Sequence, residues 1–104
     1  MSRDQTELIR RLQEGEITDP VLLAEIATED MMFEVRRAAV GQITDPVLLA
    51  RIAVEDVAWE VRQAAVWEIT DKSTLRRIAD NREELDLVRR SALWRMDRIS
   101  KEEK

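Results

Sequence analysis

Three aspartates, Asp19, Asp45 and Asp71, are the first candidates for chemistry in this sequence. Carboxylates at regular spacing can hold a divalent metal ion or share acid–base work. Each of the three, however, follows an Ile-Thr step, and proline follows the first two. An acidic acceptor directly before a proline is typical of a helix N-cap. We therefore interpret all three aspartates as caps.

The composition removes most of the remaining catalytic chemistry. The 104 residues include no cysteine and no histidine. Thiolate nucleophiles, disulfides, the usual zinc sites and the commonest general base are thus excluded. Only two glycines, Gly15 and Gly41, are present, which is too few for a glycine-rich phosphate loop. The sequence predicts no catalytic, cofactor-binding or metal-binding residue, no cofactor and no enzyme activity.

Arginines recur along the chain at intervals of 26, 26 and 27 residues. They are Arg10, Arg36, Arg62 and Arg89, and Arg11, Arg37 and Arg90 stand beside three of them. Such a column can be a structural ladder neutralised by nearby acids such as Asp30 and Asp56, or it can bind a polyanion. The net charge of −5 argues against strong nucleic-acid binding. We favour the ladder and keep nucleic-acid association as the alternative.

A second set of residues combines aromatic and polar side chains. At about 100° per residue, a helical arrangement places them on the side away from the partner helix. They are Phe33, Arg37, Trp59, Gln63, Trp67, Arg90 and Trp94. Because Trp and Arg dominate interaction hot spots, this set predicts a binding face for a protein or peptide. The competing interpretation is that the same residues fill space between neighbouring helices.

The elements that position these residues come from a repeated sequence. The eight residues ITDPVLLA occur at Ile17 and again at Ile43, an offset of 26 residues, and a related copy begins at Ile69. We infer one domain, 1–104, with repeats at 17–42, 43–68 and 69–100 and an N-terminal capping helix in 1–16. The third repeat contains one inserted residue and ends in an extended C-terminal helix. An internal period of this kind is typical of stacked structural units.

Each repeat predicts two helices. The first covers about 20–28 and 46–54, and Asp30 and Asp56 are expected to cap a second helix that ends near Gly41 and Glu68. The second helix of the third repeat is expected over 82–99. Helices this short are not stable alone in water, so they must pack on their neighbours. The prediction is an all-α superhelix, or solenoid, of three two-helix repeats plus an N-terminal half-repeat cap.

The unit resembles short HEAT-like repeats, with some likeness to the leucine-rich-variant repeat. The resemblance is carried by the Asp-Pro start, the Leu-Leu step, the aspartate before the second helix and the motif Val-Arg-x-Ala-Ala-Val. It covers residues 17 to about 98. It implies stacked helix pairs and a concave surface formed by the second helices.

A non-enzymatic interaction or scaffold module is therefore the expected function, with a protein or peptide partner. The first twenty residues contain no continuous apolar run, so we expect neither a secretory signal nor a membrane span, and a cytoplasmic protein. The polar first helix and the charged last helix are expected to cap the stack. A monomer is favoured, although Trp67 or Trp94 at the surface could drive dimerisation.

Overall fold

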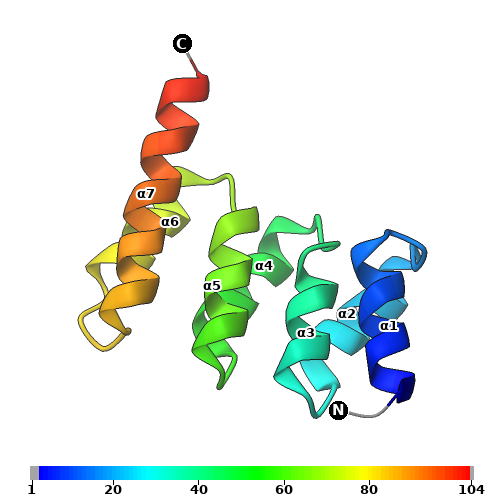
Figure 1. Ribbon diagram of the computed structural model, residues 1–104. Coiled ribbons are helices and arrows are strands. Elements are labelled where there is room, and N and C mark those ends of the chain that lie inside the picture. Colours follow the sequence, from blue (N-terminus) through cyan, green and yellow to red (C-terminus); the bar gives the residue numbers. More distant parts are fainter. Residues whose placement is uncertain (1–2, 104) are drawn as a thin grey trace.

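The chain folds into α-helices joined by short turns. The structure, a computed structural model, describes residues 3–103. Within this range it contains seven helices and no strand, which confirms the all-α prediction. The helices are α1 (Arg3–Gln13), α2 (Pro20–Glu29), α3 (Phe33–Val40), α4 (Pro46–Glu55), α5 (Trp59–Glu68), α6 (Lys72–Asp80) and α7 (Asp86–Glu102) (Figure 1).

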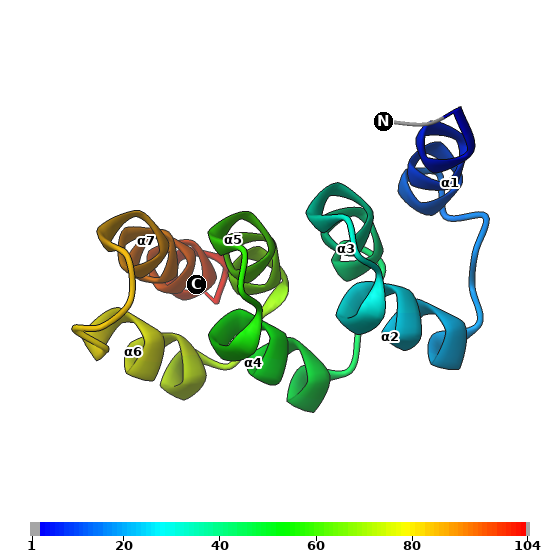
Figure 2. The same cartoon turned by 90° about the horizontal axis from the view of Figure 1, so that it is seen from below.

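The helices lie in two rows. Figure 2 shows α1, α3, α5 and α7 side by side, with α2, α4 and α6 in a second row. Each helix of the second row packs against the helix that follows it in the chain, as α2 does against α3. Within the first row, α1 packs on α3, α3 on α5 and α5 on α7. The first row is thus the continuous layer that connects the two ends of the molecule.

Valines and alanines at matching sequence positions form the core between the rows. Val35, Val61 and Val88 are fully buried, and the alanines at 27, 39, 53, 65 and 92 have no exposed surface. The small alanines allow neighbouring helices to approach closely, while each buried valine contributes roughly 1.5–3 kcal/mol through the hydrophobic effect. Burial between rows therefore supplies the stability that helices of eight to eleven residues lack alone.

The three predicted N-caps are confirmed. The carboxylates of Asp19 and Asp45 accept hydrogen bonds of 3.0 Å from the backbone N–H groups two residues later. Asp71 accepts a 2.6 Å bond from the Thr74 hydroxyl and a 2.9 Å bond from the Ser73 hydroxyl, besides longer bonds from both backbone N–H groups. These aspartates begin α2, α4 and α6, so their regular spacing follows from helix capping.

Three predicted helix boundaries were wrong. Asp30 and Asp56 do not N-cap the following helices; each ends the preceding helix, and its carboxylate accepts from the backbone two residues later, at 2.9 Å. These turns delay α3 and α5 to Phe33 and Trp59. The last helix begins at Asp86 rather than at position 82, because residues 81–85 form a hydrogen-bonded turn, and it continues to Glu102.

The cap of α6 gives a pH-dependent prediction. Hydrogen bonds from Thr74 and Ser73 lower the pKa of Asp71 below its ordinary value of about 4. The stabilisation is therefore present above pH 4 and is lost as the pH falls through the lowered pKa. We expect Asp71→Ala to melt at a lower temperature than the parent at pH 7, with the gap closing toward pH 2. Thermal unfolding followed by circular dichroism at both pH values measures this gap, and a gap that is constant with pH would contradict the assignment.

Candidate functional site

Two arginines of the predicted column connect neighbouring helix pairs through buried ion pairs. Arg36 of α3 donates from Nε and Nη2 to the Asp56 carboxylate, at 2.9 and 3.0 Å, and from Nη1 to the carbonyl oxygen of Asp30, at 2.7 Å. The two side chains are only 10% and 8% exposed. The hydrogen bonds to Asp56 raise the pKa of Arg36 against the opposing effect of burial. Arg36 thus joins the end of α2 to the turn before α5.

Arg62 repeats this geometry one helix pair later. Its Nε and Nη2 donate to Glu84 at 2.8 and 2.9 Å, and its Nη1 donates to the carbonyl oxygen of Asp56 at 2.8 Å. Sequence reasoning missed Glu84, because the inserted residue moves the acid out of register with Asp30 and Asp56. The spare arginine of the second copy was the available signal. Both guanidinium groups have their donors occupied by protein oxygens.

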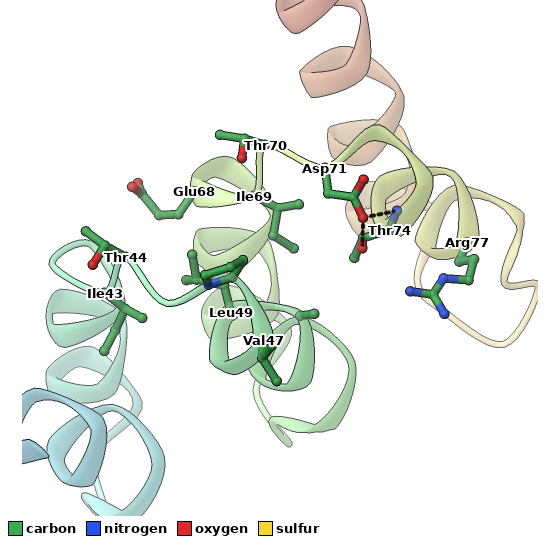
Figure 3. A pocket seen from close by; sticks show the side chains of 12 residues that line it. Ile43, Thr44, Val47, Leu49, Glu68, Ile69, Thr70, Asp71, Thr74 and Arg77 are labelled. Carbon is green, nitrogen blue, oxygen red and sulfur yellow. Dashed lines mark hydrogen bonds between the residues drawn. The ribbon is translucent and has the colours of Figure 1, made fainter. Parts of the chain in front are cut away.

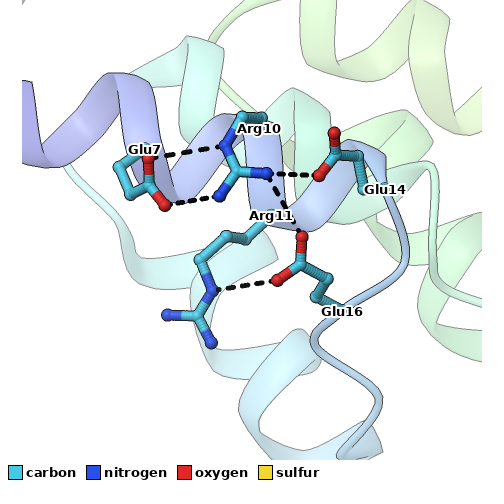
Figure 4. A network of polar contacts seen from close by, with 5 residues as sticks. All are labelled: Glu7, Arg10, Arg11, Glu14 and Glu16. Atoms are coloured by element: carbon cyan, nitrogen blue, oxygen red, sulfur yellow. Dashed lines mark hydrogen bonds and ion pairs between the residues drawn. The ribbon is translucent and has the colours of Figure 1, made fainter.

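The column changes at its two ends. Arg89 donates from Nε to the carbonyl oxygen of Ala79 at 2.9 Å, which is its one polar contact within residues 3–103. Arg10 is half exposed and bonds within its own segment to Glu7, Glu14 and Glu16, while Arg11 pairs with Glu16 at 3.7 Å (Figure 4). The bond to Glu7 raises the pKa of Arg10 and lowers that of Glu7.

The register of α1 explains why Arg10 departs from the pattern. Leu12 is fully buried and Leu8 and Ile9 are half buried against the core, so these side chains define the inner face of α1. Arg10 is then turned toward solvent, where glutamates of its own segment neutralise it. The exposed ends of α1 are therefore covered by charge.

The aromatic residues divide into an exposed pair and a half-buried pair. Trp67 and Trp94 are 37% and 51% exposed and meet edge to face, with ring centroids 5.0 Å apart and an interplanar angle of 82°. Arg98 lies over the Trp94 ring at 5.1 Å, a contact that sequence reasoning missed. Phe33 and Trp59 are half buried and pack against the core. The structure thus brings Trp67 and Trp94 together at the C-terminal end of the first row.

The polar members of the predicted face have separate surroundings. Gln63 donates to the Ser91 hydroxyl at 2.8 Å and so bridges α5 and α7. Arg37 is exposed and lies 5.9 Å from the Phe33 ring centroid. Arg90 is exposed and pairs with Asp86 at 3.2 Å, one helical turn earlier. Gln63 therefore serves helix packing, while the two arginines remain at the surface.

A groove that the sequence did not predict lies between α4 and α6. It has a volume of about 580 Å³ and is lined by apolar residues of α4, including Val47 and Ala50, and by Thr74 and Arg77 of α6 (Figure 3). Glu68 stands at its margin, where burial raises the pKa of the carboxyl against the opposing charge of Arg95. Carboxylates and arginine are mixed along the groove, so it has no single electrostatic preference.

The described residues show no arrangement that could hold a metal ion. No group of three His, Cys, Asp or Glu side chains converges within residues 3–103. In the same range, none of the helices combines the length and apolarity that a bilayer crossing requires. The chain matches no protein-family model, no curated protein and no solved structure. The functional argument therefore rests on the surface of the first row.

The Arg36–Asp56 pair predicts a large loss of stability on truncation of one partner. We expect Arg36→Met to lower the free energy of unfolding by about 3–5 kcal/mol, because it leaves the Asp56 carboxylate buried without its cation. Urea denaturation measures the change. Arg37→Met, at the exposed neighbouring position, is the matched control and should cost less than about 1 kcal/mol. Equal losses in the two variants would refute the structural role of Arg36.

Proposed function

We propose that the chain is a HEAT-like α-solenoid that acts as a non-enzymatic interaction module. The 26-residue sequence period and the side-by-side packing of α2–α3, α4–α5 and α6–α7 support the solenoid. The binding face is the outer side of α3, α5 and α7, opposite the second row. Stacked helix pairs provide an extended rigid surface without chemistry of their own.

The exposed Trp67–Trp94 pair is the observation that carries this proposal. Trp67 lies about 120° round α5 from the fully buried Val61, so its ring is directed away from the core. Large aromatic rings that remain partly exposed and well ordered against each other are the type of surface that partners use as hot spots. Because the two rings already constrain each other, little side-chain freedom is lost when a partner covers them.

The charges around the pair define the partner. Arg98 stacks on Trp94, and Arg37 stands exposed on the same row next to Phe33. An apolar side chain set against the indoles, with acidic residues beside it, would meet both features. The partner is therefore a protein segment or peptide that carries an apolar residue flanked by Asp or Glu. Phe33, Trp59 and Gln63 support this face through packing.

Nucleic-acid association through the arginine column is the weaker alternative. Phosphate binding needs guanidinium groups that are free to displace counterions. Arg36 and Arg62 instead have buried carboxylate partners, and Arg10 is surrounded by glutamates. No observation favours the alternative over the protein-binding face.

The proposal predicts that binding depends on the two indoles. A partner captured from native lysate with the parent chain, then purified, should bind the Trp67→Ala/Trp94→Ala variant at least about tenfold more weakly, the loss typical of a hot spot. Isothermal titration calorimetry measures both dissociation constants. Val47→Ala is the matched control, because this side chain is 77% exposed on α4 in the other row.

Val47→Ala should leave the dissociation constant unchanged. Circular dichroism must show that all variants keep the helical content of the parent. A partner that binds the double tryptophan variant as tightly as the parent would place the binding surface elsewhere.

A further inference from the structure

One face of α7 is not used in packing within the chain. Six residues of this helix fall within an arc of about 100°, and all six are exposed. They are Asp86, Arg90, Leu93, Trp94, Asp97 and Lys101, which we name the α7 face. Leu93 is 47% and Trp94 is 51% exposed, and the neighbouring Leu87 is 48% exposed. α7 is also the longest helix, with 17 residues, and it lies at the end of its row (Figure 2).

The corresponding side of the preceding helices is covered by a helix. Leu93 aligns in the sequence repeat with Val66 of α5 and Val40 of α3, and both valines are fully buried. α5 covers the side of α3 that bears Val40, and α7 covers the side of α5, where Gln63 bonds to Ser91. The surface around Leu93 is therefore of a kind that receives a helix twice within this same molecule.

The charges of the α7 face follow an order that complements its own reverse. From the N-terminal end the face reads acid, base, apolar, apolar, acid, base. Asp86 pairs with Arg90 at 3.2 Å, and Asp97 pairs with Lys101 at 3.0 Å. Read from the other end, every acid meets a base. A second α7 in antiparallel orientation therefore offers opposite charges at each position, whereas a parallel one offers like charges.

We propose that the chain forms a twofold-symmetric homodimer through antiparallel pairing of α7. With the axis at the midpoint between Leu93 and Trp94, Leu93 packs against the partner's Trp94. Arg90 meets the partner's Asp97, and Asp86 meets the partner's Lys101. Each contact occurs twice, as an isologous interface requires.

The apolar centre and the charged flanks have different roles in this dimer. Burial of Leu93, Trp94 and part of Leu87 supplies the driving force, because these side chains lose contact with water. Exposed ion pairs add little free energy, at about 0–1 kcal/mol each, but they select the antiparallel alignment. A contact between two single helices is smaller than a standard interface, so the association depends on protein concentration.

The dimer does not rest on the proposed binding function, although Arg90 and Trp94 belong to both surfaces. The partner copy covers the side of α7 that faces away from α5. Trp67, Phe33 and Arg37 lie outside the α7 face, so a protein partner would still find them accessible on the same molecule.

Charge exchange provides the test. Sedimentation equilibrium of the parent chain should show an average mass that rises from the monomer value toward twice that value as concentration increases. Arg90→Asp or Asp97→Arg alone places like charges opposite each other and should weaken the dimer by at least about tenfold. The double variant, Arg90→Asp with Asp97→Arg, restores the complementary order between copies and should recover most of the parent affinity.

Arg51→Asp on α4 is the control for the change in net charge and should leave the parent affinity unaltered. Circular dichroism should show folded helices in each variant, because the exchanged residues are exposed. A parent that stays monomeric at millimolar concentration would overturn the proposal. So would single variants that associate as the parent does, or a double variant no better than the singles.

Discussion

The structure depends on one constraint, which is that none of its helices is long enough to be stable without a neighbour. Six of the seven described helices have 8 to 11 residues, a length that is marginal in water. Each is stabilised by the valines, leucines and alanines that it buries against the adjacent helices. The buried surface is continuous from Leu12 in α1 to Met96 in α7. Loss of packing at any point therefore affects the helices on both sides.

Buried ion pairs set how the helix pairs are placed relative to one another. The apolar core favours close approach, but it does not by itself fix the register between neighbours. Arg36 and Arg62 each bond to a carbonyl oxygen of their own helix pair and to a carboxylate of the next pair. These bonds are directional and leave little exposed surface on either partner. The arginines thus align successive pairs.

The two ends of the row differ in how they meet solvent. At α1, Arg10 is enclosed by glutamates of its own segment, so that end is covered by charges already paired with one another. At the other end, α7 exposes Leu93 and Trp94 between charged flanks, and Arg89 has no carboxylate partner among the described residues. This difference is why the functional proposals concentrate at the C-terminal end of the row.

The sequence by itself determined the helical class, the position of the A-type helices and their capping aspartates, because proline, capping acids and apolar periodicity act within a few residues. The starts of α3, α5 and α7 could not be read in this way, since turns at Asp30, Asp56 and Asn81 delay each helix. Likewise, the sequence identified the arginine column and the tryptophans but could not assign their partners. Tertiary structure decided that Arg62 meets Glu84 and that Trp67 meets Trp94, because residues 22 and 27 positions apart come together only when neighbouring helices pack.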